Sequence, residues 1–111
     1  MTNEKITIEE YQEFTQSTFI VPDSVAESYL AFGLVAEAGE LAGQYAKYLR
    51  NDFDFMELDK RVRKELGDMM YFIVQLCNYY EWDVRDVMQE NKDKLLKRLR
   101  ENKIRGDGDM R

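Results

Sequence analysis

Helix-start signals recur along this chain, and a single proline, Pro22, is the strongest break between them. At residues 7–10, 24–27 and 54–57, a capping residue is followed three positions later by a glutamate. Asp83 is a further cap in front of a periodic segment. The pattern predicts an all-α fold with helices at 7–18, 24–49, 54–80 and 83–101, and a loop or frayed end at 105–111.

The third predicted helix is apolar in nearly every direction after Asp68, through Met69, Met70, Tyr71, Phe72, Ile73, Val74, Leu76 and Cys77. Such a helix is buried on all sides, and two antiparallel neighbours do not easily supply that much burial. The chain has 111 residues, which suits one domain over residues 1–111, and domains of this size often gain stability by associating. We expect four main helices in a bundle, assembled as a dimer or a dimer of dimers.

Three glycines, Gly33, Gly39 and Gly43, lie inside the second predicted helix. Each costs about 1 kcal/mol of helix stability relative to alanine. Close packing against neighbouring helices is the expected reason for their presence.

The charge balance is acidic, with 22 acidic against 16 basic residues and a net charge of −6. This balance disfavours a nucleic-acid partner, because neutralising phosphates needs a basic excess. The one cysteine, Cys77, excludes an internal disulfide and fits a reducing compartment. Residues 1–5 do not form a signal peptide, and the apolar run 69–74 is too short to span a bilayer. We expect a cytoplasmic protein without a membrane partner.

Histidine is absent from the sequence. Its absence excludes histidine-based acid–base catalysis and nearly all zinc sites, and it disfavours a di-iron bundle of the Glu-x-x-His type. Any metal must therefore be held by oxygen ligands, which selects Mg²⁺, Mn²⁺ or Ca²⁺.

Two acidic pairs stand on helix faces that should point into the interior. With about 100° per residue, Glu37 lies within roughly 60° of Leu30, Leu34, Leu41 and Tyr48. Glu65 lies within roughly 40° of Leu58, Met69, Phe72 and Leu76. Glu40 and Asp68 flank these two residues one turn later. The four carboxylates should therefore converge between the second and third helices.

Four buried carboxylates repel one another and lose solvation, which costs several kcal/mol per uncompensated ion. Protonation, pairing with Arg61 or Lys64, or a metal ion could relieve this cost. A divalent ion is favoured because the two pairs present hard oxygen ligands from facing helix turns. Their charge exceeds that of one Mg²⁺, which suggests a second ion or an ion that arrives with a phosphate substrate.

At these residues the sequence resembles the MazG-like all-α nucleoside triphosphate pyrophosphohydrolases. The family motif is Glu-x-x-Glu on one helix and Glu-x-x-Asp on the next, here in GLVAEAGEL at residues 33–41 and KELGDMMY at residues 64–71. The resemblance covers most of the chain. One departure is Ala36, where many members carry a further glutamate, so a role of that residue in positioning water is missing here.

The resemblance implies hydrolysis of a nucleoside triphosphate to the monophosphate and pyrophosphate, with Mg²⁺ or its substitute Mn²⁺. It implies that Glu37, Glu40, Glu65 and Asp68 bind metal, and one carboxylate should act as general base, with Glu37 and Glu40 as the candidates. Asn91, Lys94 and Arg98 share one face of the fourth helix, and they are the expected phosphate-binding residues. A solvated basic face is the alternative for Lys94 and Arg98.

Two other functions remain open at this point. One is a pyrophosphatase specific for dUTP or dCTP from the same all-α superfamily. The other is a helical interaction module whose interior acids are salt-bridged and bind no metal. A phosphate-binding loop of the Gly-x-x-x-x-Gly-Lys-Ser/Thr type is absent from the sequence, so that route to phosphate is excluded.

Overall fold

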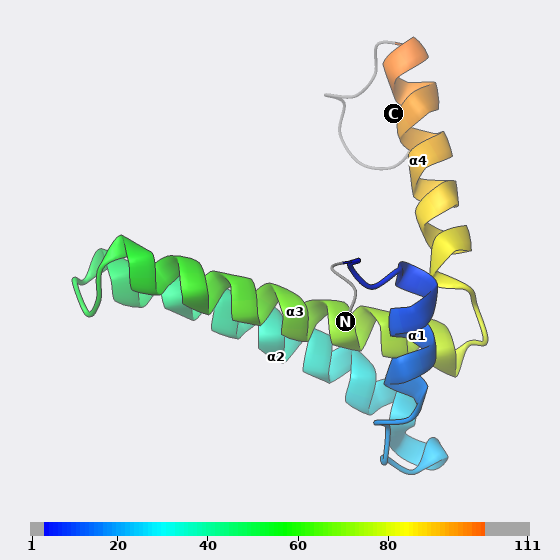
Figure 1. The fold of residues 1–111 in the computed structure, drawn as a ribbon, viewed down its shortest axis with the longest axis horizontal. Coiled ribbons are helices and arrows are strands. Elements are labelled where there is room, and N and C mark those ends of the chain that lie inside the picture. Colours follow the sequence, from blue (N-terminus) through cyan, green and yellow to red (C-terminus); the bar gives the residue numbers. More distant parts are fainter. Residues whose placement is uncertain (1–3, 102–111) are drawn as a thin grey trace.

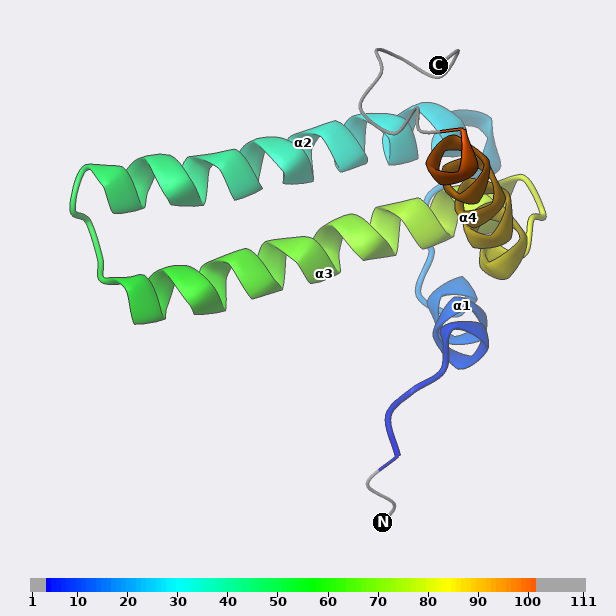
Figure 2. The same ribbon diagram turned by 90° about the horizontal axis from the view of Figure 1, so that it is seen from above.

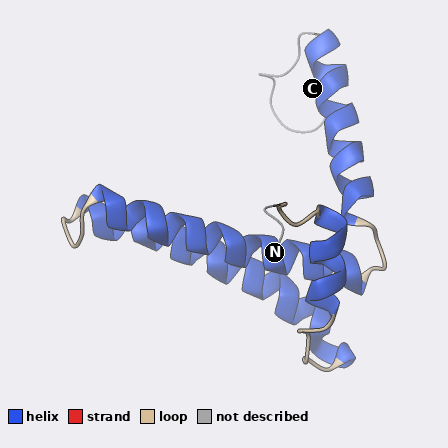
Figure 3. Ribbon diagram, in the orientation of Figure 1, coloured by secondary structure: helices blue, strands red, loops and turns tan. Residues whose placement is uncertain are grey.

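Four α-helices make up the secondary structure of residues 4–101, the part of the chain that this computed structural model describes (Figure 3). Within that range there is no strand, and the helices are α1 (Ile8–Gln16), α2 (Asp23–Leu49), α3 (Phe55–Tyr79) and α4 (Val84–Arg100). The predicted all-α class and the four predicted helices are confirmed. The loop predicted at 105–111 lies outside the described residues.

Three of the four predicted caps form as expected. The side chain of Thr7 accepts a hydrogen bond from the backbone N–H of Glu10 at 3.1 Å, and that of Asp54 accepts from Glu57 at 2.9 Å. Asp83 accepts from the N–H of Arg85 at 2.8 Å. Each bond satisfies a backbone donor that has no partner inside its helix.

The cap predicted at Ser24 is wrong, because α2 begins one residue earlier. Pro22 is the N-cap, with φ −59° and ψ 141°, and no side chain caps this end of α2. Proline already has the backbone conformation needed here, so the helix starts directly after it and Ser24 falls inside the first turn.

The two long helices, α2 and α3, form an antiparallel hairpin (Figures 1 and 2). Gly33 is the point of closest approach, because a Cβ atom there would lie 2.2 Å from the ring of Phe72. The packing explanation therefore holds for this glycine. Gly39 and Gly43 face open space within the chain, so it does not hold for them in a single copy.

The remaining helices pack at one end of the hairpin. Helix α1 crosses the C-terminal end of α3, and α4 packs mainly against α1 and then projects away from the hairpin (Figure 1). The radius of gyration is 17.3 Å, whereas a compact chain of this length has about 13 Å. The predicted bundle is therefore not closed within one chain.

The hydrophobic core is correspondingly small. Among the described residues, the buried apolar side chains are Ala26, Leu30, Val74, Cys77 and Val84. On α3, where burial on all sides was expected, Leu66, Met70 and Ile73 are 45%, 60% and 43% exposed. No helix in the described range combines the length and the apolar character needed to cross a bilayer.

Candidate metal centre

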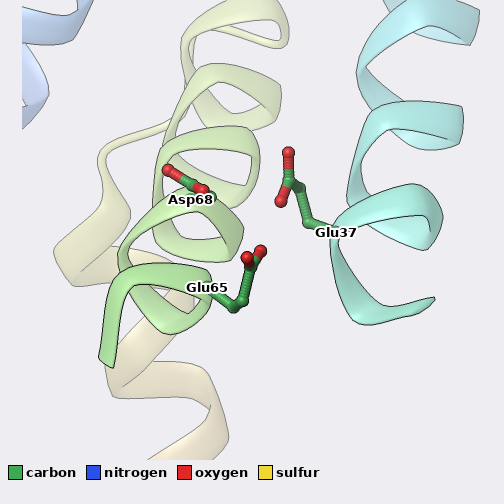
Figure 4. Close-up of side chains that lie close together, drawn as sticks. All are labelled: Glu37, Glu65 and Asp68. Carbon is green, nitrogen blue, oxygen red and sulfur yellow. The ribbon is translucent and has the colours of Figure 1, made fainter. Parts of the chain in front are cut away.

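Three carboxylates meet between α2 and α3, near the middle of the hairpin (Figure 4). Glu37 comes from α2, and Glu65 and Asp68 come from α3. Each contributes one oxygen to a group in which all three atoms lie within 4.8 Å of one another. The convergence follows from helical periodicity, because the i, i+3 spacing places Glu65 and Asp68 on one face of α3.

Two oxygens of this group are buried and make no hydrogen bond. They are Oε2 of Glu37 and Oε2 of Glu65, and Glu65 as a whole is only 3% exposed. A buried acceptor without a partner costs roughly 1–3 kcal/mol, and more when it is charged. Folded proteins rarely leave such atoms unsatisfied, so these two oxygens point to a ligand that binds between the helices.

Glu37 is the carboxyl group of this site whose pKa is raised. Burial, together with the adjacent Glu65 carboxyl group, raises the pKa of Glu37 from 4.5 to about 7. The charges of Glu40, Asp68 and Glu65 raise this pKa further, because each opposes a second negative charge nearby. A bound cation would reverse these effects by favouring the ionised carboxylate.

Basic side chains neutralise this cluster only in part. The Nζ of Lys64 lies 3.2 Å from Asp68 and 3.6 Å from Glu65, but the lysine side chain is 69% exposed. Such a surface pair contributes little to stability. One exposed cation faces three carboxylates, and within residues 4–101 no basic side chain forms an ion pair with Glu37.

Arg61, the other proposed partner, does not pair with the cluster. Its Nε lies 3.7 Å from Glu57, its guanidinium lies 4.2 Å from the centre of the Phe53 ring, and it donates to Oε1 of Gln44 at 3.3 Å. Gln44 in turn donates to Oε1 of Glu65 at 3.5 Å. The sequence analysis did not identify Gln44, although it lies two helical turns after Glu37 on the same face of α2.

The fourth predicted ligand, Glu40, does not join the group. Its side chain is exposed, and it lies outside the set of carboxylates within 4.8 Å of one another. It is close enough for its charge to raise the pKa of Glu37. Glu40 therefore stands at the rim of the site, one turn after Glu37 on α2.

The predicted phosphate-binding residues lie elsewhere. Asn91 and Lys94 are exposed on α4, and Arg98 is buried at 4% exposed. Because α4 projects away from the hairpin, these residues do not converge with the carboxylates in one chain (Figure 1).

The donor set suits a hard divalent cation. All three converging ligands are carboxylates, and the two buried oxygens without partners face the space between the helices. Mg²⁺ and Mn²⁺ bind through a few carboxylates and retain water or phosphate oxygens in their other positions. The residues present therefore fit a metal of this type.

Comparison with known proteins supports the family resemblance of the sequence. A family model described as the MazG nucleotide pyrophosphohydrolase domain matches residues 26–102, and the chain belongs to this family. "Gene 37 protein" of Mycobacterium phage L5 is 37% identical over 109 residues, which cover 91% of this chain and 96% of the relative. That name specifies no activity. No solved structure matches the chain.

Proposed function

We propose that this protein is a Mg²⁺-dependent nucleoside triphosphate pyrophosphohydrolase, which cleaves an NTP or dNTP to the monophosphate and pyrophosphate. Membership of the MazG family supports nucleotide pyrophosphohydrolase chemistry. The observation that carries the metal assignment is the pair of buried oxygens on Glu37 and Glu65 that lack hydrogen-bond partners. Mn²⁺ should replace Mg²⁺, because it accepts the same oxygen ligands.

In this proposal Glu37, Glu65 and Asp68 hold the metal, and Glu40 completes the set from the rim of the site. The bound ion would neutralise phosphate oxygens and orient substrate and water. The chain itself supplies a fixed, largely dry pair of carboxylates on two packed helices, and such fixed positioning lowers the barrier for in-line attack.

Glu37 and Glu40 are the two candidates for general base. The pKa of Glu37, raised to about 7 without metal, would fall once a cation binds, so this pKa does not choose between them. Glu40 is exposed and better placed to meet the incoming substrate.

The direct test is product analysis with a panel of ribo- and deoxynucleoside triphosphates and Mg²⁺ or Mn²⁺. We expect monophosphate and pyrophosphate in equal amounts, whereas orthophosphate and diphosphate would contradict the proposal. The same panel distinguishes a broad enzyme from one restricted to dUTP or dCTP.

A thermal melt distinguishes the enzyme from a salt-bridged interaction module. A metal that binds only the folded protein raises its melting temperature with increasing concentration. We expect such a rise with Mg²⁺ or Mn²⁺, and an interaction module should show none.

A further inference from the structure

The two oxygens of the buried Glu65 carboxylate differ in their surroundings. Oε1 accepts a hydrogen bond from Nε2 of Gln44 at 3.5 Å, and the exposed Nζ of Lys64 lies 3.6 Å from the same atom. Oε2 is buried and has no hydrogen-bond partner. Figure 4 shows the Glu65 side chain directed from α3 toward α2, the helix that carries Gln44. The carboxylate is therefore held at one oxygen, and the other is left for a ligand.

Gln44 is half-buried on α2 and connects Glu65 to a second residue of α3, Arg61. Arg61 and Glu65 are four positions apart, so they lie on the same face of α3. Nη1 of Arg61 donates to Oε1 of Gln44 at 3.3 Å. Because a guanidinium group has donors and no acceptor, it fixes which end of the Gln44 amide faces it. The amide NH₂ group is therefore turned to Glu65, where a rotated amide would present a repelling oxygen.

Arg61 is itself held by residues at the turn end of the hairpin. Its Nε lies 3.7 Å from Oε1 of Glu57, one turn earlier on α3, and its guanidinium carbon lies 4.2 Å from the centre of the Phe53 ring. Phe53 directly precedes Asp54, whose side chain caps α3 by accepting from the backbone N–H of Glu57 at 2.9 Å. The ion pair and the aromatic ring restrict a side chain that is 40% exposed. A series of contacts therefore leads from the turn, through Arg61 and Gln44, to the buried carboxylate.

We propose that Gln44, oriented by Arg61, is a positioning residue of the metal centre: it holds Oε1 of Glu65 so that the oxygen without a partner faces the bound divalent ion. This step rests on the proposed function, because it requires a metal at the site. Hydrogen bonds from outside the ligand set fix the orientation of metal-binding side chains, and their loss typically costs about 10–100-fold in metal affinity. Gln44 contacts the ligand and not the reacting atoms, so its effect is on metal binding.

The charge of Arg61 and its hydrogen bond predict opposite effects on metal binding. A positive charge near the carboxylates repels a divalent ion, so removing the charge alone would tighten binding. Without the guanidinium, however, the Gln44 amide can rotate and turn its oxygen to Glu65, which displaces the ligand and weakens binding. In this proposal the second effect is the larger, so the sign of the change distinguishes positioning from simple electrostatics.

The test is the affinity for Mn²⁺, measured by titration calorimetry on the full chain without nucleotide. We expect Gln44→Met, which keeps the length of the side chain, and Arg61→Leu each to weaken binding about 10-fold. Arg63→Leu is the matched control, because Arg63 is exposed on a different face of α3 and its loss removes the same charge. It should leave the affinity unchanged or raise it. Circular dichroism and melting in a chelator show that each variant is folded, and Gln44→Leu replaces Gln44→Met if the latter is not.

The double variant Gln44→Met/Arg61→Leu tests whether the arginine acts through the glutamine. If it does, the double variant should bind Mn²⁺ no more weakly than Gln44→Met alone, whereas independent effects would multiply to about 100-fold. Such an additive loss, tighter binding by Arg61→Leu, or an unchanged affinity of Gln44→Met would each overturn the positioning role while the metal centre stands. A wild type that binds no Mn²⁺ would instead contradict the proposed metal centre itself, and the positioning role with it.

Discussion

Helix α3 carries two polar clusters that differ in hydrogen bonding. The buried side chains of one have partners, whereas the other contains buried oxygens without any. Near its C-terminal end, Gln75 donates to the backbone oxygen of Thr15 at 2.6 Å and accepts from Asn78 at 2.9 Å. Asn78 also donates to the Thr15 hydroxyl at 3.0 Å, and its own oxygen accepts from Gln12 at 3.0 Å. About three turns earlier on α3, buried oxygens of Glu65 and of Glu37 opposite it have no partner.

The difference distinguishes a structural cluster from the proposed metal centre. The amide cluster joins α1 to α3, and its buried side chains Thr15 and Gln75 are saturated with partners. A network of this type fixes one arrangement of helices. The acid cluster also has a buried member, Glu65, but two of its oxygens have no partner. A protein retains such a cost when a bound ligand offsets it. The comparison therefore predicts that removing a group from each cluster has opposite consequences for activity and stability.

The largest effect should follow Glu65→Gln, which removes a charge but little volume. We expect hydrolysis to fall by about 10³-fold or more, because the variant loses a buried metal ligand. Without metal, the variant should be as stable as the wild type or more stable by roughly 0.5–2 kcal/mol, because repulsion is relieved. Steady-state kinetics and urea unfolding in a chelator measure the two effects.

Glu13→Gln on the exposed side of α1 is the matched control, and it should change neither quantity. A Glu65→Gln protein that unfolds far more easily than the wild type would show that this acid is part of a salt-bridged core instead.

The next effect should follow Gln75→Leu in the amide cluster. The substitution keeps the volume but removes the three hydrogen bonds that Gln75 makes with the Thr15 carbonyl, the Asn78 amide and the Tyr71 hydroxyl. We expect the free energy of unfolding to fall by roughly 2–4 kcal/mol. Urea unfolding checks this, with Gln89→Leu on the exposed surface of α4 as control. An unchanged Gln75→Leu stability would mean that the two clusters do not differ as described.

The sequence predicted the acid cluster better than the amide cluster, for a physical reason. The positions of Glu37, Glu65 and Asp68 follow from the 3.6-residue period and from the fact that two long helices must pack on their apolar stripes. Gln75 and Asn78 find partners on α1 that are 60 and 63 residues away, and no local pattern encodes such pairing. The one available signal was that Gln75 interrupts an otherwise apolar run.

The starts of the helices and the direction of α4 show the same limit: features set by local sequence were predicted, and those set by packing were not. Caps at Thr7, Asp54 and Asp83 are local and were predicted, whereas the conformation set by Pro22 moved the start of α2 by one residue. The direction of α4 depends on its packing against α1, so sequence placed Asn91, Lys94 and Arg98 on one helix face without placing that face near the site.

The stability of the metal-free protein should depend on pH through Glu37. Because its pKa is raised from 4.5 to about 7, folded Glu37 keeps a proton that the unfolded chain loses. Without metal, the free energy of unfolding should therefore fall as pH rises from about 4.5 to 7, by roughly 1–3 kcal/mol, and change little from this cause above that window. Glu37→Gln should remove this pH dependence. Urea unfolding at several pH values measures it, and the variant following the wild-type profile would contradict the assignment.

The smallest effect separates the members of the acid cluster from one another. Asp68 is 41% exposed at its side chain and lies 3.2 Å from the exposed Lys64, so its charge is already partly compensated. In a chelator above pH 7, where Glu37 is ionised, Asp68→Asn should therefore melt with the wild type. Glu37→Gln should melt higher, because it removes a charge that the neighbouring carboxylates oppose. With Mg²⁺ added, the wild type should gain stability and both variants should gain less, since each lacks one ligand. The opposite result would be an Asp68→Asn protein that melts well below the wild type in chelator and keeps its full response to Mg²⁺. Asp68 would then belong to a structural ion pair with Lys64, and the two glutamates would hold the metal without it.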